Sequence, residues 1–176
     1  PNEKQMAKLV HRYLMDQGYQ VGCVHPEDDL GDLKLYVIPH WEIIDPEWIP
    51  NLRAFAENGG TLVIGARTAC RDKNNHCLAQ PLPGVLRELA GVTVDEIGRI
   101  RDSAYRPLRL AFEQKQVTVE EWYEKLAPEE GTEVVHEWQS RHLAGEAAVT
   151  SRKVGKGQVV YVGTYLTEPV LEGLMP

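Results

Sequence analysis

The sequence lacks a long apolar run and is poor in cysteine. No run approaches the roughly 18 consecutive apolar residues that a transmembrane helix needs, and no secretory leader opens the chain. Its 3 cysteines among 176 residues are too few, and odd in number, for a disulfide framework. These absences predict a cytoplasmic protein with reduced thiols and no membrane contact, unless a leader precedes the sequence.

Clusters of positive charge are also absent. The net charge is −7, and lysine and arginine occur singly or in pairs, which argues against nucleic acid as a partner. Hydrophobic residues make up 43% of the chain, enough to form the core of a single domain over residues 1–176.

Helix and strand signals alternate in the first half. Asn2 and Gln5 have the spacing of a capping box, and apolar residues then follow a helical stripe until Gly18. A second helix begins where Asp45 can cap it and Pro46 can occupy its first turn. Apolar strands are expected at residues 19–24, 33–38 and 61–66. This alternation predicts an α/β fold, a mostly parallel sheet with helices on both faces.

The second half predicts antiparallel strands. They are expected at residues 92–97, 108–112, 117–123, 133–138, 147–151 and 158–162. The sequence VGKG at 154–157 indicates a hairpin turn, because glycine adopts positive φ without steric cost. Thr167 can cap a last helix. A doubly wound sheet normally begins with a strand, whereas this sequence opens on a helix, so we expect that a first strand is truncated.

Several separated stretches together resemble one protein family. They are, in order, DQGYQV, HPEDDLGDLKLYVIP, LRAFAENGGTLVIGARTACRDKNN, PLPGVLRELAGVTVDE and AAVTSRKVGKGQVVYVGTYL. In this order and spacing they resemble the middle domain of the family 42 glycoside hydrolases, the β-galactosidases, over about residues 10–167. The chain departs from the family at Thr68 and Ala69, where relatives tend to place Ser-Gly, and over residues 97–113.

The resemblance implies a flavodoxin-like fold similar to class I glutamine amidotransferases, with a strand before the first helix. It also implies a non-catalytic role, in which the domain holds the enzyme as a homotrimer and helps to wall a neighbouring subunit's active site. The family's two catalytic glutamates lie in a preceding TIM barrel, so we expect no catalytic residue, cofactor or metal in this chain. The expected partners are that barrel and neighbouring subunits, and the parent enzyme would hydrolyse terminal β-galactosides.

The stretch GARTAC, residues 65–70, raises an enzymatic alternative. A class I amidotransferase places its nucleophile in Gly-x-Cys-x-Gly, on a strained turn after a strand. With Gly65 as the first glycine, Arg67 stands at the nucleophile position and Ala69 replaces the second glycine. Arginine stays protonated and cannot act as a nucleophile. A divergent hydrolase that uses the nearby Cys70 is one alternative, and a stand-alone sugar- or partner-binding module is another.

Candidate contact residues follow the expected strands, because ligands and partners meet open α/β sheets at the carboxyl ends of the strands. The polar stretch 67–80 is long for a simple connection. We expect Arg67, Arg71, Asp72 and Asn74 to contact the barrel or a neighbouring subunit. Trp41 follows the preceding strand and is a candidate subunit or sugar contact, because tryptophan is enriched in interface hot spots.

Overall fold

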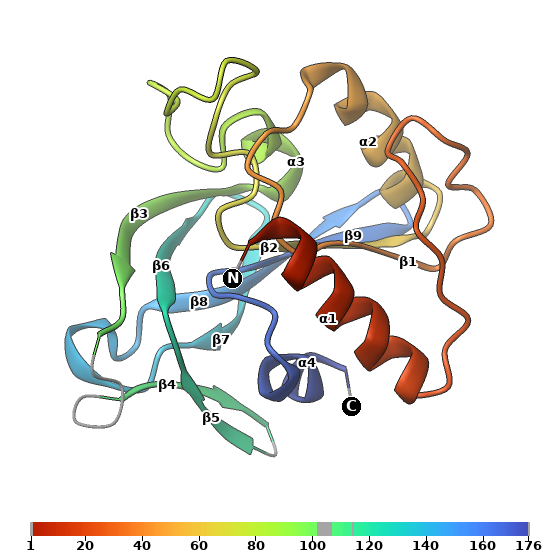
Figure 1. Ribbon diagram of the computed structural model, residues 1–176. Helices are drawn as coiled ribbons and strands as arrows, with labels where there is room; N and C mark the ends of the chain where they lie inside the picture. The colour runs from red at the N-terminus through yellow and green to blue at the C-terminus, as the bar shows by residue number, and fades with distance from the viewer. Residues whose placement is uncertain (1, 102–106, 114, 176) are drawn as a thin grey trace.

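The computed structural model describes residues 2–101, 107–113 and 115–175, and these form an α/β fold around a mixed sheet (Figure 1). The main sheet has 7 strands in the order β1-β2-β9-β8-β6-β3, with β7 paired to β8, and β4 and β5 form a separate 2-stranded sheet. The strands are β1 Leu35–Ile38, β2 Thr61–Gly65, β3 Val92–Arg99, β4 Leu108–Phe112, β5 Lys115–Val119, β6 Trp122–Pro128, β7 Thr132–Glu137, β8 Ala147–Val154 and β9 Gly157–Val162.

Four α-helices accompany these strands in the described ranges: α1 Glu3–Asp16, α2 Ile49–Glu57, α3 Arg87–Ala90 and α4 Glu168–Leu174. The capping box is confirmed: the Gln5 backbone N–H donates to Asn2 Oδ1 at 2.9 Å, and the Asn2 backbone N–H donates to Gln5 Oε1 at 3.0 Å. Asp45 caps as expected, but the turn that it caps is a 3₁₀ helix, Pro46–Trp48, ahead of α2. None of the helices described here has the length and apolar character that crossing a membrane requires.

The sheet changes from parallel to antiparallel at β9. β1 runs parallel to β2, and β2 runs parallel to β9. β9 then pairs antiparallel with β8, through the predicted hairpin in which Val154 lies opposite Gly157. The remaining pairs, β8 with β6 and β7, and β6 with β3, are antiparallel, which confirms the expected character of the second half.

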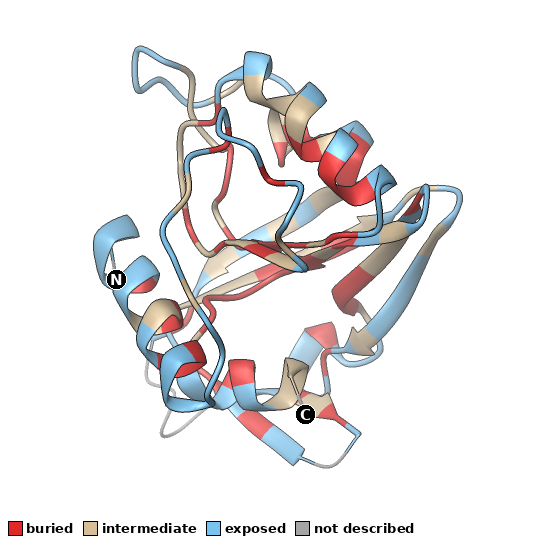
Figure 2. Cartoon of the chain, turned by 90° about the vertical axis from the view of Figure 1, so that its right-hand side faces the viewer, coloured by how far each residue is buried: buried red, intermediate tan, exposed pale blue. Residues whose placement is uncertain are grey.

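Two apolar layers lie on opposite faces of the sheet (Figure 2). Because side chains alternate along a strand, Leu62 and Ile64 of β2 point into one layer and Val63 points into the other. Helices α2 and α3 cover the first layer, and α1, α4 and the β4–β5 hairpin cover the second. Helices on both faces are therefore confirmed.

Two strand predictions are wrong. Residues 19–24 are irregular, because a strand needs a neighbour for its backbone groups and no described segment pairs with them. They are held by a hydrogen bond from the Tyr36 hydroxyl to the Val24 carbonyl at 2.8 Å and by one from the Tyr19 N–H to the Leu14 carbonyl at 3.0 Å. The strand expected at 117–123 is two strands, β5 and β6, because the chain turns at Glu121, whose φ is 70°. The poorly matching stretch 97–113 lies partly outside the described residues.

Gly65 brings the ends of β1 and β2 together. A Cβ at this last residue of β2 would lie 2.1 Å from the Pro39 carbonyl oxygen, which follows β1. Real Cβ atoms essentially never approach other atoms so closely, and a backbone oxygen cannot rotate away. Glycine is therefore required for the two chain segments to leave the sheet side by side at its carboxyl edge.

We expect Gly65→Ala to destabilise the chain by about 1–3 kcal/mol, the usual cost of overpacking, because the backbone must shift to admit the methyl group. The control is Gly22→Ala, where a Cβ would meet nothing within 4 Å. Urea unfolding followed by tryptophan fluorescence measures both variants. Equal midpoints for Gly65→Ala and the control would show that the contact carries no constraint.

Candidate functional site at the carboxyl edge of the parallel strands

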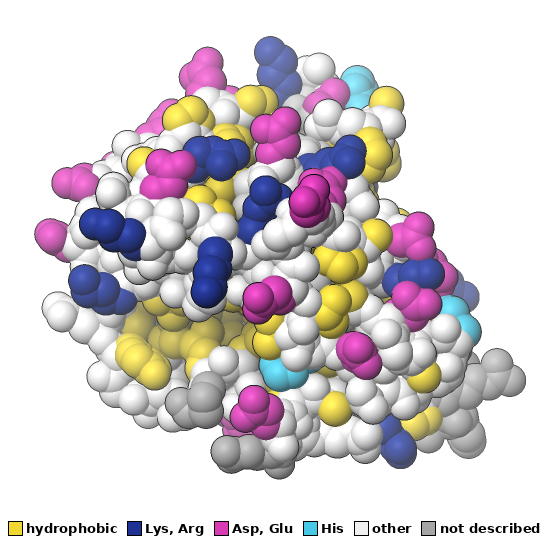
Figure 3. Space-filling view, turned by 180° about the vertical axis from the view of Figure 1, so that it is seen from behind, with side chains coloured by type: hydrophobic (Ala, Val, Ile, Leu, Met, Phe, Trp, Pro, Cys, Tyr) yellow, Lys and Arg dark blue, Asp and Glu magenta, His cyan; other side chains and the backbone are white. Residues whose placement is uncertain are grey.

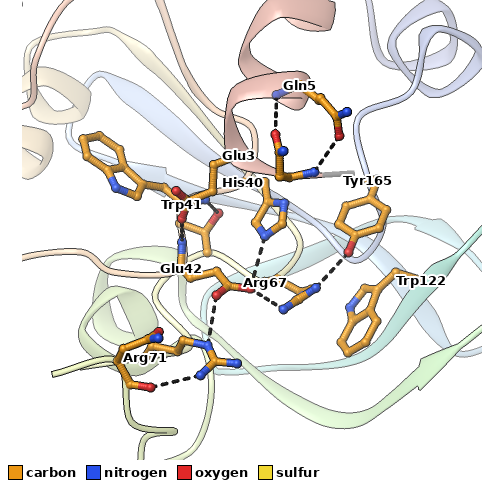
Figure 4. A network of polar contacts seen from close by, with 12 residues as sticks. Glu3, Gln5, His40, Trp41, Glu42, Arg67, Arg71, Trp122 and Tyr165 are labelled. Carbon is orange, nitrogen blue, oxygen red and sulfur yellow. Dashed lines mark hydrogen bonds and ion pairs between the residues drawn. The ribbon is translucent and has the colours of Figure 1, made fainter. Parts of the chain in front are cut away.

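Loops from the carboxyl ends of β1, β2 and β9 meet at one edge of the sheet (Figure 4). The loop after β1 carries His40, Trp41 and Glu42, the loop after β2 carries Arg67 and Arg71, and Tyr165 follows β9. The N-terminus of α1 lies beside them, and the Glu42 backbone N–H donates to Glu3 Oε1 at 2.7 Å.

Two arginines hold the carboxylate of Glu42. Arg67 Nη2 donates to Glu42 Oε1, and Arg71 Nε lies 2.9 Å from Oε2. Arg71 also donates through Nη1 to the Asn75 carbonyl at 3.0 Å. The half-buried carboxylate offsets part of the positive charge of the two arginines, and charge-assisted bonds of this kind fix the loops after β1 and β2 to each other.

Both the side chain and the backbone of Arg67 have bonding partners. Its Nη1 donates to the Tyr165 hydroxyl at 3.1 Å, and its guanidinium carbon lies 5.0 Å from the centroid of the Trp122 ring, a cation–π distance. Its backbone N–H donates to Glu124 Oε1 at 2.9 Å. The φ of Arg67 is 62°, in the left-handed region that costs about 1–3 kcal/mol for a residue with a side chain.

Glu124 is a buried carboxyl group of β6 that several donors satisfy. In addition to Arg67, the Trp122 indole donates to Oε1 at 3.2 Å and the Tyr161 hydroxyl donates to Oε2 at 2.8 Å. The Trp138 indole donates to the Glu124 backbone carbonyl at 3.1 Å. Burial raises the pKa of Glu124 above its ordinary value, although the hydrogen bonds from Arg67, Tyr161 and Trp122 act in the opposite direction.

Cys70 is a poor nucleophile in this setting. Burial, and then the negative charge of Glu42, raise the pKa of the Cys70 thiol to about 11. A reactive cysteine needs a lowered pKa, since the thiolate is the attacking species. The turn after β2 has the strained backbone expected of a nucleophile position, but the residue that occupies it is Arg67.

His40 is buried beside this cluster. Its ring lies 5.4 Å from the Tyr165 ring, centroid to centroid. Burial, and then the positive charge of Arg67, lower the pKa of His40, so that the imidazole is neutral at neutral pH. Its Nε2 lies 3.6 Å from Glu42 Oε1, which is too long for a hydrogen bond.

The five contact candidates divide into three groups. Arg67 and Arg71 converge on Glu42. Asp72 organises its own loop, because its Oδ1 accepts from the backbone N–H groups of Asn74, at 2.8 Å, and of residue 76, at 2.9 Å; the Asn74 side chain is exposed. Trp41 packs against Trp48 with ring centroids 5.0 Å apart and ring planes tilted by 46°, away from the arginine cluster. Their contact with a barrel or a neighbouring subunit stays a prediction.

Sequence reasoning missed four residues of this edge: His40, Glu42, Glu124 and Tyr165. Two of them had a usable signal, since His40 and Glu42 flank Trp41 directly after an apolar strand. Glu124 had none, because a glutamate within WYEKL is typical of a half-exposed strand.

We expect the Glu124→Gln variant to keep the fold. Its free energy of unfolding should depend less on pH than that of the unmodified protein. The raised pKa means that the folded state prefers the protonated carboxyl, so this group's contribution to stability is present below the unfolded pKa and is lost as pH rises through the folded pKa. Glutamine mimics the protonated form, and its amide can donate to the Tyr161 oxygen.

Urea unfolding of both proteins from pH 4 upwards, about the ordinary pKa of glutamate, tests this expectation. Glu124→Leu serves as the contrast, because each donor left unsatisfied costs about 1–3 kcal/mol. A Gln variant that loses as much stability as the Leu variant would mean that the ionised carboxylate is required.

Comparison with known proteins places the chain in a family. A family profile described as "Beta-galactosidase trimerisation domain" matches residues 2–176. β-Galactosidase BgaA of Clostridium cellulovorans is 31% identical over 160 residues, covering 91% of this chain and 24% of the relative. β-Galactosidase LacZ of Heyndrickxia coagulans is 27% identical over 165 residues, covering 94% of this chain and 24% of the relative. The chain thus spans about a quarter of these relatives.

Solved structures share the fold. The crystal structure of a β-galactosidase from Bacillus circulans sp. alkalophilus superimposes with a TM-score of 0.89 at 22% identity, covering 99% of this chain and 26% of that one. The β-galactosidase of Halorubrum lacusprofundi gives a TM-score of 0.85 at 24% identity, covering 97% of this chain and 25% of that one. With the profile match over residues 2–176, the chain belongs to the β-galactosidase trimerisation domain family.

Proposed function

We propose that this chain is a non-catalytic scaffold domain that holds a β-galactosidase as a homotrimer, in contact with its own catalytic barrel and with neighbouring subunits. The observation that carries the proposal is the closed arginine cluster at the carboxyl edge. The position of an amidotransferase nucleophile is filled by Arg67, whose guanidinium is already engaged by Glu42, Tyr165 and Trp122. This arrangement is consistent with an amidotransferase-like fold that lacks the amidotransferase nucleophile.

Exposed apolar surface supports an assembly role. Seen from behind, the molecule is hollowed where apolar side chains gather (Figure 3). Large hydrophobic side chains are also exposed on α1 and its end, on β3 and on β7: Met15, Tyr19, Ile97, Val134 and Val135. An apolar hollow such as the one in Figure 3 is typical of protein contact sites.

The proposed partners are protein, and the proposed location is the cytoplasm. The net charge of −7 disfavours nucleic acid. All 3 cysteines are free thiols, as is usual in a reducing compartment.

The first experiment is to express the complete reading frame and to measure its mass by analytical ultracentrifugation and its turnover of a β-galactoside. We expect a mass of three subunits and galactosidase turnover. A monomer in solution, or a reading frame without a barrel of roughly 250 residues, would contradict the proposal.

We also expect Cys70→Ala to leave the kcat/KM of the complete protein unchanged within about twofold, because a thiol with a pKa of about 11 is protonated at neutral pH. The comparison is made at equal sedimentation mass, so that a change in assembly is not mistaken for a change in chemistry. Loss of turnover in a correctly assembled Cys70→Ala protein would favour the divergent-hydrolase alternative.

A further inference from the structure

Strand β1 has one unpaired edge. It lies at the end of the main sheet and, in the described ranges, pairs only with β2. The Thr61 N–H donates to the Lys34 carbonyl at 2.9 Å, and the backbone groups of successive strand residues point to opposite sides. The N–H and C=O groups of Leu35 and Val37 therefore face away from β2. Both side chains pack against the second layer, so this edge belongs to the sheet interior and is a template for a further strand.

Residues 19–24 run past this edge in the same direction as β1. Tyr19 follows the end of α1, where its N–H donates to the Leu14 carbonyl. Just after the segment, the His25 ring lies 6.0 Å from the ring of Trp41, centroid to centroid. Trp41 follows β1, and α1 begins at the carboxyl edge of the sheet. The segment therefore returns from the far end of α1 to the carboxyl edge.

The side chains of this segment place it in the plane of the sheet. Val21 packs against the second layer and Val24 against the first, the alternation of a strand. Both sides of β2 are paired, so this in-plane position is beyond β1. The Tyr36 hydroxyl of β1 donates to the Val24 carbonyl at 2.8 Å. A tyrosine side chain is longer than the roughly 4.7–4.9 Å between neighbouring strands, so this contact can span the width of one inserted strand.

The start of α1 lies where such a strand would end. Glu3 accepts a hydrogen bond from the backbone N–H of Glu42, which follows β1, and the N-terminus lies beside β2 (Figure 1). In α/β folds a connection of about 2–6 residues joins the carboxyl end of a strand to the next helix. A strand that leads into α1 at this edge therefore runs parallel to β1.

The handedness of the crossovers gives the same position. Helices α1 and α2 cover opposite faces of the sheet, so right-handed crossovers through them progress in opposite directions across it. Helix α2 connects β1 to β2. Helix α1 therefore connects a strand beside β1 to a segment farther from β2, which is the place of residues 19–24.

We propose that the residues that precede residue 1 in the complete protein form a parallel strand between β1 and residues 19–24. Its backbone bonds to Leu35 and Val37 on one side and to residues 19–24 on the other. The chain spans about a quarter of its relatives, so a protein of their length has residues to supply this strand. The inference rests on the proposed function for the longer protein, and it assigns the β1 edge to the same chain and not to a neighbouring subunit.

Hydrogen–deuterium exchange of the complete protein tests this inference. One variant replaces the stretch before residue 1 by a glycine–serine sequence of equal length, over about ten residues, which is a strand and its connection. The peptides that report are residues 19–24 and 33–38. Strand β7 is the internal control, because it pairs only with β8 in the described ranges and lies away from β1.

We expect the backbone N–H groups of residues 19–24, 35 and 37 to exchange about tenfold faster, or more, in the variant, because an unpaired edge opens at little cost in free energy. Exchange in β7 should be unchanged. Equal exchange of the reporting peptides in the two proteins would overturn the inference.

A structure of the unmodified complete protein decides the question even if the variant does not fold. A parallel strand from the residues before residue 1, beside β1, supports the inference. Four results would overturn it: a β1 edge open to solvent, residues 19–24 paired directly with β1, a strand from residues after 176, or a strand from a neighbouring subunit.

Sedimentation mass and galactoside turnover of the same sample test the proposed function separately. A monomer with the strand in place would contradict only the trimer. A trimer with turnover and an open β1 edge would contradict only the inserted strand.

Discussion

The carboxyl edge depends on one hydrogen bond, from the Arg67 backbone N–H to the buried carboxyl group of Glu124. It joins the turn after the parallel strand β2 to the antiparallel strand β6, 57 residues later in the chain. The bond holds Arg67 in a left-handed conformation that is unfavourable for a residue with a Cβ. With its backbone fixed, the Arg67 side chain lies over Trp122 and reaches Glu42, so the loop after β1 is held as well.

This network is arranged for rigidity and not for chemistry. A catalytic group needs a pKa near the working pH, and a nucleophile needs a nearby base. The thiol pKa of Cys70 is shifted away from that range, and in the described part of the chain no hydrogen bond joins its sulfur to a histidine. The carboxylate of Glu42 is occupied by two guanidinium groups, so it too is unavailable as an acid or a base.

The sequence predicted those elements whose signals are local. The first helix follows from the Asn2–Gln5 box and its apolar stripe, and the β8–β9 hairpin follows from its glycines. Residues 19–24 have a strand-like composition, but a strand forms only beside another strand, and pairing is not a local property. The strand-like residue pattern at 117–123 runs through the turn that separates β5 from β6. The prediction missed this turn, because nothing in the residue types marks the positive φ of Glu121. β9 pairs parallel with β2 across nearly a hundred residues, which no local pattern reveals.

The site was predictable to the extent that position along a strand decides it. Arg67 and Arg71 were found because they follow a buried strand, and the same rule applied to the loop after β1 would have found His40 and Glu42. The role of Glu124 could not be predicted from the sequence, because its burial results from the packing of Trp122, Tyr161 and Trp138 around it. A glutamate buried at this depth is recognised only when its donors are known.

At the same edge, some polar groups have hydrogen-bond or ion-pair partners within the chain and others have none among the described residues. Arg67, Glu42 and Glu124 have partners, and they fix the backbone around Trp41. The Trp41 carbonyl accepts from the Ala69 N–H at 2.9 Å, and its N–H lies 3.4 Å from Thr68 Oγ1. Beside this rigid frame the Trp41 ring is half-exposed, and the imidazole of His40 is buried without a hydrogen bond among the described residues. Ordering side chains and loops on binding costs free energy. Because this network already orders the loops at the carboxyl edge, a partner that binds there does not have to order them.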